Sequence, residues 1–135
     1  MKICVSAVAN SLDAQVDPRF GRCSYFIIVD SETMQFEAVP NVASGIVGGA
    51  GIQAAQTIAS KGAQVLITGN VGPNAFQALI AAGIKIVTSA FGIVREVVEK
   101  YKRGELRETS TSTVRGHFGM GMGRGRSRGR GQWGI

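Results

Sequence analysis

The sequence predicts an α/β protein in which helices cover both faces of one sheet. Two observations predict this class. Residues 48–87 contain a helix–strand unit that is used twice, and the strand of each unit is a short apolar run. Such runs are typical of parallel strands, which are buried on both faces. With 135 residues, 44% of them hydrophobic, the chain is long enough for one domain with a layered α/β core.

The repeat emerges when residues 48–87 are aligned to themselves at an offset of 21 positions. The offset matches Gly51 to Gly72, Ala54 to Ala75, Ile58 to Leu79 and Gly62 to Gly83. Each predicted helix has an apolar stripe, which is Ile52/Ala55/Ile58/Ala59 in the first and Ala75/Phe76/Leu79/Ile80 in the second. Each helix ends at a glycine, which can adopt the left-handed conformation that follows many helices. The apolar strands at residues 65–66 and 86–87 complete the two units.

Three further strands are predicted before the repeat. In the first, Ile3, Val5 and Ala7 share one face. The second and third are joined by a short turn and form an antiparallel hairpin, with the third at an edge, where Pro40 is tolerated. The predicted strands are residues 2–8, 25–29 and 34–39.

A third helix is predicted at residues 93–103, before Gly104. Its apolar face and two ion pairs at a spacing of four residues, Glu96 with Lys100 and Glu99 with Arg103, favour this interpretation. The element order is therefore βββαβαβα. It describes a mixed sheet that begins with antiparallel strands and ends with right-handed crossovers.

The charge is distributed unevenly along the chain. Residues 1–108 contain 10 Lys or Arg and 9 Asp or Glu, whereas residues 109–135 contain five Arg and no acid. The C-terminal segment is also glycine-rich and has no hydrophobic periodicity. We therefore expect a folded domain at residues 1–108 and a disordered Gly/Arg-rich tail at residues 109–135.

The composition also limits the functional class. No apolar run reaches the roughly 18 residues that a membrane helix needs, and the N-terminus has the pattern of a first strand, so we expect a cytoplasmic protein.

Two cysteines cannot form a four-cysteine metal site. Because His117 is the single histidine and the core strands lack acids, we expect no enzyme. The acids Asp13, Asp17 and Asp30 fall in loops or at strand ends, where solvation explains them.

Two loops are candidates for a ligand site. In open α/β sheets, ligands bind beyond the carboxyl ends of the parallel strands, where residues 68–74 and 88–92 fall. The sequence GNVGPN places Pro73 at the start of a helix, and the backbone N–H groups there favour an anionic ligand. The alternative is a tight connection that needs glycine. The glycine-rich sequence GGAG at residues 48–51 suggests a dinucleotide site, but it lacks the G-x-G-x-x-G spacing of such a site, and we do not expect a nucleotide ligand.

The second loop places Arg19, Arg22 and Cys23 within five residues. The arginines can hold a carboxylate, a phosphate or an anionic metal cluster, and they would lower the pKa of the Cys23 thiol. The alternative for Cys23 is a small buried residue, which is also the interpretation favoured for Cys4. In the tail, His117 and the neighbouring methionines can supply soft metal ligands, or this segment can be a spacer.

The chain resembles the dinitrogenase iron–molybdenum cofactor biosynthesis family. The resemblance rests on RFGRCSYFIIVD and on the repeat that contains VLITGNVG and AGIKIV, and it covers about residues 1–103. It implies a three-layer α/β/α sandwich similar to the ribonuclease H motif, with a five-stranded mixed sheet of order 3-2-1-4-5 and strand 2 antiparallel. It also implies non-catalytic binding of an iron–sulfur or iron–molybdenum cofactor precursor, exchanged with cluster donor or acceptor proteins.

The resemblance also implies site residues. The F-G-R motif of the family falls on Phe20, Gly21 and Arg22, and the family's glycine-rich loop falls on Gly69, Asn70 and Gly72. Two positions depart from the family pattern. Arg19 stands where many relatives have a histidine, and Asn70 replaces a glycine.

The sequence therefore supports two hypotheses. The first is a small carrier that binds a metal cluster or its precursor between residues 19–23 and 69–74, with Cys23 or His117 as metal ligands. The alternative is a nucleic-acid interaction protein, whose arginine-rich tail binds single strands while Phe118 and Trp133 stack on bases.

Overall fold

Five strands form one mixed sheet in the computed structural model, which describes residues 1–45, 49–110 and 112. The strand order is β3-β2-β1-β4-β5. β2 runs antiparallel to both of its neighbours, whereas β1, β4 and β5 are parallel. The strands are β1 (Lys2–Ala7), β2 (Tyr25–Asp30), β3 (Phe36–Pro40), β4 (Val65–Ile67) and β5 (Lys85–Val87). The predicted order and directions are confirmed.

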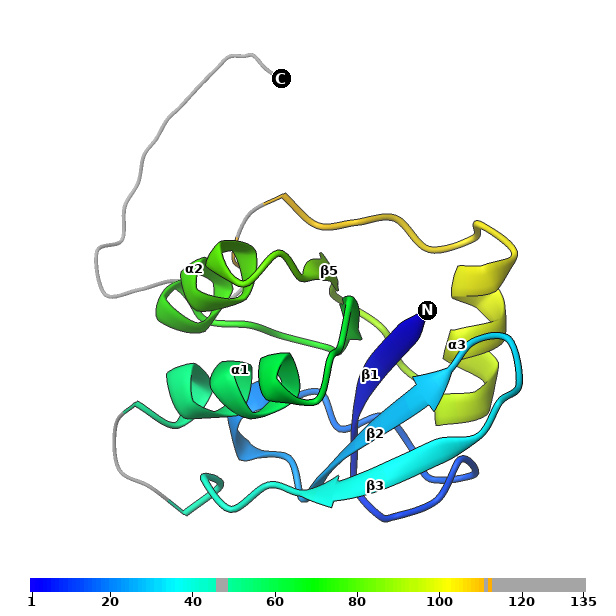
Figure 1. Ribbon diagram of the computed structural model, residues 1–135, viewed down its shortest axis with the longest axis horizontal. Coiled ribbons are helices and arrows are strands. Elements are labelled where there is room, and N and C mark those ends of the chain that lie inside the picture. The colour runs from blue at the N-terminus through cyan, green and yellow to red at the C-terminus, as the bar shows by residue number, and fades with distance from the viewer. Residues whose placement is uncertain (46–48, 111, 113–135) are drawn as a thin grey trace.

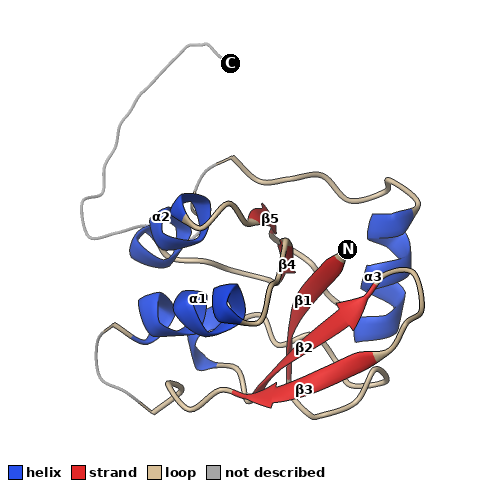
Figure 2. Cartoon of the chain, viewed as in Figure 1, coloured by secondary structure: helices blue, strands red, loops and turns tan. Residues whose placement is uncertain are grey.

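Helices cover both faces of this sheet and make three layers (Figures 1 and 2). The helices are α1 (Ala50–Ser60), α2 (Pro73–Ala81) and α3 (Val94–Lys102), with a short 3-10 turn, η1 (Phe20–Arg22), before β2. Alternate residues of β1 contribute to two hydrophobic clusters, one on each face of the sheet. Ile3 and Val5 pack in the α3 layer, while Cys4 packs in the layer of α1 and α2. None of the helices within the described residues is long and apolar enough to cross a membrane.

The predicted repeat is confirmed as α1–β4 and α2–β5. Gly62 and Gly83 follow the two helices with φ of +81° and +79°, which is the left-handed conformation expected at these positions. The predicted apolar stripes are wrong at one residue each. Ile52 is 38% exposed and Ile80 is 51% exposed. In α1 the buried position falls on Ala54, outside the predicted stripe, and in α2 Ala75 is buried as predicted. Such small side chains let the two helices pack closely.

Two local predictions are wrong. The third strand begins at Phe36 and not at Met34, because Met34 has a φ of 61° and its side chain packs against the α3-side core. The predicted ion pairs of α3 also differ. Glu99 pairs with Lys102 at 3.4 Å, and Arg103 pairs with Glu105 at 2.6 Å just beyond the helix.

The chain returns from α3 to the outer edge of β5 (Figure 1). The Thr109 N–H donates to the Ile86 carbonyl at 2.6 Å, and the Thr88 N–H donates to the Thr109 hydroxyl at 3.1 Å. The hydroxyls of Thr88 and Thr109 are 2.6 Å apart. We call these three contacts the threonine clasp. The predicted domain boundary after residue 108 stays a prediction, and it falls immediately before a residue that is bonded to the sheet.

We expect Thr109→Val to lower the free energy of unfolding by about 1–2 kcal/mol, because the Thr88 N–H loses its acceptor and the Thr88 hydroxyl loses its partner. Chemical denaturation monitored by circular dichroism measures the change. The exposed neighbour Ser110, changed to Ala, is the control and should leave the midpoint unaltered. Equal midpoints for both variants would mean that the clasp contributes no stability.

Candidate functional site

The two loops singled out in the sequence lie against each other at the carboxyl end of the sheet. The Asn70 N–H donates to the Pro18 carbonyl at 2.7 Å, and the Phe20 N–H donates to the Asn70 carbonyl at 3.4 Å. Gly69 makes this contact possible, since a Cβ there would lie 2.5 Å from the Pro18 Cα. The structure therefore joins residues 17–22 to residues 69–74 through backbone contacts.

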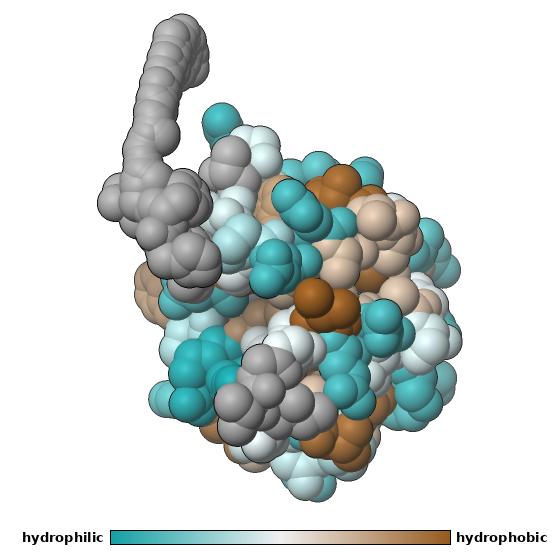
Figure 3. Space-filling model, turned by 90° about the vertical axis from the view of Figure 1, so that its left-hand side faces the viewer, coloured by the Kyte–Doolittle hydropathy of each residue, from teal (hydrophilic) through white to brown (hydrophobic). Residues whose placement is uncertain are grey.

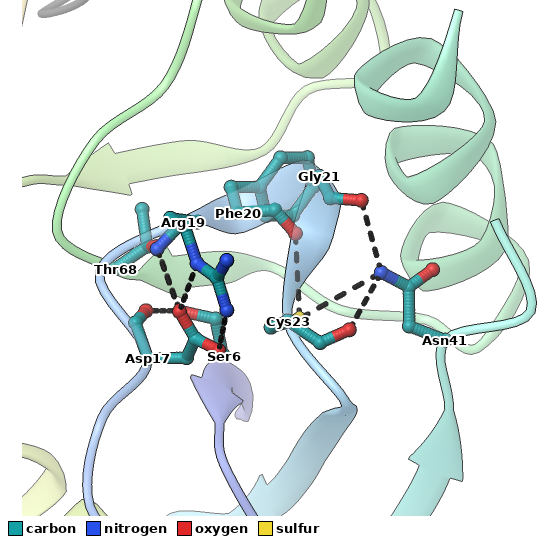
Figure 4. A network of polar contacts seen from close by, with 8 residues as sticks. All are labelled: Ser6, Asp17, Arg19, Phe20, Gly21, Cys23, Asn41 and Thr68. Atoms are coloured by element: carbon teal, nitrogen blue, oxygen red, sulfur yellow. Dashed lines mark hydrogen bonds and ion pairs between the residues drawn. The ribbon is translucent and has the colours of Figure 1, made fainter. Parts of the chain in front are cut away.

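A buried polar network holds the first loop to the sheet (Figure 4). Ser6 at the end of β1 and Thr68 directly after β4 are both buried, and their hydroxyls are 2.7 Å apart. The Ser6 hydroxyl also donates to the Asp17 carbonyl at 2.6 Å, and the Asp17 N–H donates to the Ser6 carbonyl at 2.9 Å. Because these groups are removed from water, their mutual hydrogen bonds fix the position of the loop.

Asp17 holds the turn at residues 17–19 of this loop. The prediction that Asp17 is explained by solvation is wrong. The residue is 2% exposed, and its carboxylate accepts hydrogen bonds from the Arg19 N–H at 2.9 Å and from the Arg19 Nε and Nη2 at 3.3 Å. These bonds raise the pKa of Arg19. An aspartate side chain that accepts a hydrogen bond from the backbone N–H two residues later forms a known turn, so the sequence D-P-R contained a signal for the turn. It contained no signal for the burial of Asp17.

The F-G-R motif forms η1, in which each residue has a different environment. Phe20 is buried, with its ring 5.4 Å from that of Phe26. Gly21 lies against the start of α1, because a Cβ there would be 3.1 Å from the Gly51 Cα. The Asn41 side chain donates to the carbonyls of Gly21 and Cys23 at 3.1 and 2.9 Å (Figure 4). No local sequence signal identified this role of Asn41.

Cys23 is buried, and the predicted lowering of its thiol pKa is wrong. The residue is 0% exposed, and its sulfur donates to the Phe20 carbonyl at 3.3 Å. Burial first, and the nearby Asp17 charge second, raise the pKa of Cys23 to about 12. Burial and the Asp17 charge outweigh the arginine charges that were predicted to lower this pKa. Burial likewise raises the pKa of Cys4, in agreement with the core interpretation.

The N-termini of α1 and α2 converge beside η1 and form a cavity of about 290 Å³. Figure 3 shows the side of the molecule on which both helices begin. Gly49 and Gly72 occupy the capping positions, and neither helix has a side-chain cap. The first N–H groups of a helix have no intrahelical partner and carry its positive dipole end. Both helices therefore present donors here.

The donors around the cavity suit an anion. Arg22 lines it, and its Nη1 donates to the Ser44 carbonyl at 2.8 Å; of the described residues that line the cavity, none is acidic. Small residues bring the walls together, since a Cβ at Gly51 would lie 2.9 Å from the Ala75 Cβ. Within the described ranges, no group of three or more His, Cys, Asp or Glu side chains could hold a metal ion.

The predicted site residues divide into three groups. Phe20, Gly21, Arg22, Asn70 and Gly72 line the cavity. Arg19, Gly69 and Cys23 do not line the cavity, but they belong to the two loops and contact residues beside it. His117 lies outside the described residues. Binding by any of them stays a prediction.

The fold defines a small α/β/α domain built on a mixed sheet of order 3-2-1-4-5. The chain belongs to the family described as dinitrogenase iron-molybdenum cofactor, whose profile matches residues 1–104. Family membership confirms the resemblance that the sequence motifs indicated. It places the chain among small accessory, cofactor-related proteins.

The chain is similar to three further proteins over most of its length. The apo form of the orange protein from Desulfovibrio gigas is 45% identical, with a TM-score of 0.82 over 84% of this chain and 96% of that one. A NifB-like protein from Thermotoga is 37% identical, with a TM-score of 0.74 over 85% of this chain and 98% of that one. An uncharacterized protein of Methanocaldococcus jannaschii is 28% identical over 80% of this chain and 95% of its own length.

We expect Gly69→Ala to destabilise the protein by about 1–3 kcal/mol, because the added Cβ meets the Pro18 backbone and forces the two loops apart. Thermal unfolding measures the loss. Gly72→Ala is the matched control, since a Cβ there meets nothing within 4 Å and φ is −74°. Similar losses in both variants would show that the close contact is not the cause.

We expect neither cysteine of the folded chain to react with a thiol reagent at pH 8, whereas both should react in denaturant. The raised pKa of Cys23 means that the folded state holds the thiol proton more tightly than the unfolded state. This contribution to stability is complete below the ordinary pKa of 9.0 and is lost as the pH rises towards about 12. Rapid reaction of one thiol per folded chain would contradict the burial.

Proposed function

We propose that this protein is a non-catalytic carrier that binds an iron–sulfur or iron–molybdenum cofactor precursor as its cargo. One observation carries the proposal, namely that two helix N-termini without side-chain caps and the Arg22 guanidinium converge on one cavity with no acid among its described lining. The family assignment supplies the chemical class of the cargo.

The chemistry of the cavity fits such a cargo. Metal–sulfur clusters accept hydrogen bonds at their sulfurs, and their properties depend on net charge and on those bonds. Backbone N–H groups at a helix N-terminus, together with a guanidinium, are donors of the required kind. Binding through hydrogen bonds and charge leaves the cargo free to pass to a second protein. We infer that the partners are cluster donor or acceptor proteins.

Cys23 has no direct role in this proposal. Its sulfur is buried and protonated, so it acts by packing behind η1 and not as a ligand. The cavity lining favours a carrier over an enzyme, because its described residues include no activated nucleophile or general base. The structure of the relative from Desulfovibrio gigas is that of an apo form, the form of a protein without its bound group, and we propose that this chain likewise occurs without its cargo.

The nucleic-acid alternative rests on residues 115–133, outside the described part of the chain. Residues 1–108 carry nearly balanced charge, so any affinity for nucleic acid would come from the five tail arginines. The expected cytoplasmic location is likewise a prediction from sequence.

We expect Arg22→Gln to lower the amount of iron and sulfide retained after anaerobic reconstitution, and to weaken cargo binding about tenfold or more, because a charge-assisted hydrogen bond is lost. Arg95→Gln on α3 removes the same charge from the opposite layer and should retain as much as the parent chain. Cys4→Ser and Cys23→Ser should also retain it. Equal retention in the Arg22 and Arg95 variants would remove the cargo from this cavity.

Circular dichroism and thermal unfolding accompany this experiment, because Arg22 also donates to the Ser44 carbonyl. A folded Arg22 variant with reduced retention supports the site. Loss of retention in the Cys23 variant alone, with the fold intact, would instead support the cysteine as a ligand.

A further inference from the structure

Two asparagine side chains line the cavity without taking part in the fold. Asn70 lies in the loop after β4, and Asn74 is the second residue of α2. Both residues are exposed, and neither carboxamide hydrogen-bonds to a described residue of the chain. A carboxamide has N–H donors and a carbonyl acceptor. These groups are therefore available to a ligand in the cavity.

Asn41 shows the contrasting, structural use of an asparagine. It is buried, and its Nδ2 donates to the carbonyls of Gly21 and Cys23 at 3.1 and 2.9 Å. These bonds offset the loss of water around the buried amide. Asn70 and Asn74 are neither buried nor bonded in this way, so the stability of the fold does not explain their side chains.

Both asparagines are held in place by their backbones. The Asn70 N–H donates to the Pro18 carbonyl at 2.7 Å, and the Asn70 carbonyl accepts a second backbone bond at 3.4 Å. Asn74 lies in the first turn of α2, where the Phe76 N–H donates to the Gly72 carbonyl at 2.9 Å. Since an asparagine side chain has few rotatable bonds, a ligand orders it at a smaller entropic cost than a lysine or an arginine.

The rest of the lining gives these carboxamides a specific task. Among the described residues of the lining, Arg22 is the one cation and none is acidic. A guanidinium is planar and presents its donors as a fork, so it serves acceptors on one side of a compact anion. Acceptors on the other sides need further donors, and a neutral carboxamide supplies them without burying a second charge.

We propose that Asn74, together with Asn70, is a specificity-determining residue whose Nδ2 group donates to the anionic cargo while Arg22 balances its charge. The inference rests on the proposed function. It narrows the class of cargo to anions that carry acceptor atoms on several sides, as a metal complex does through its sulfide or oxide atoms. A carboxylate group of a larger molecule presents its oxygens on one side, and Arg22 alone would satisfy it.

The test loads the full chain anaerobically with ferrous iron and sulfide, removes the excess, and follows the loss of visible absorbance after a ferrous chelator is added. We expect Asn70→Ala and Asn74→Ala each to release the bound species about three to ten times faster, because a hydrogen bond to the anion is lost. Asn74→Asp preserves the shape of the side chain but replaces its donors with a negative charge. It should release the species faster than Asn74→Ala does.

Gln77 is the matched control, because it lies about one turn further along α2, is exposed and does not line the cavity. Gln77→Ala and Gln77→Glu repeat the two chemical changes there. They should alter the release rate less than about twofold, since a charge on the exposed surface is screened by salt. Circular dichroism confirms that each variant is folded.

The possible results separate this inference from the proposed function. Unchanged release in the folded Asn70 and Asn74 variants, with loss of retention in Arg22→Gln, overturns the inference and leaves the carrier proposal intact. Release from Asn74→Asp at the parent rate means that the side chain acts by shape alone, which also overturns it. Equal acceleration in Asn74→Asp and Gln77→Glu reduces the effect to overall charge, with the same consequence. A parent chain that retains neither iron nor sulfide removes both proposals.

Discussion

The close contact of Pro18 with Gly69 is the constraint on which the candidate site depends. No side chain fits between these two backbones. The contact allows η1 to lie beside the start of α2, and the buried hydroxyls of Ser6 and Thr68 hold the loop from below. A looser contact would separate Arg22 from the N-terminus of α2, and the donors would no longer face one cavity.

Much of the fold was predictable because its determinants are local. The repeat at an offset of 21 residues, with Gly62 and Gly83 after its helices, specified two helix–strand units. The strand order implied by the family resemblance then placed the two candidate loops at the same end of the sheet. The environment of Asp17, Asn41 and Cys23 was not predictable, because their burial and partners depend on residues that are distant in the sequence.

Glycine stands at the capping position of both helices, but the two positions differ in backbone conformation. A serine, aspartate or asparagine at Gly72, where the backbone is extended, would satisfy a first-turn N–H with its own side chain, which glycine does not. Gly49 has a φ of +73°, a left-handed conformation that favours glycine. Gly21 and Gly51 instead provide space, because a Cβ at either would crowd a neighbouring segment. The glycines around the cavity therefore have separate structural reasons, which are backbone conformation at Gly49 and close packing at Gly21 and Gly51.

The position of the threonine clasp has a practical consequence for handling the protein. An affinity tag placed before Met1 would stand at the amino edge of the sheet, since β1 begins at Lys2. A fusion partner joined after Ile135 would instead follow a chain whose last described bonds to the sheet are those of the clasp, just beyond the carboxyl end of β5. Immobilisation through the N-terminus thus leaves the carboxyl end of the sheet, where the cavity lies, turned away from the support.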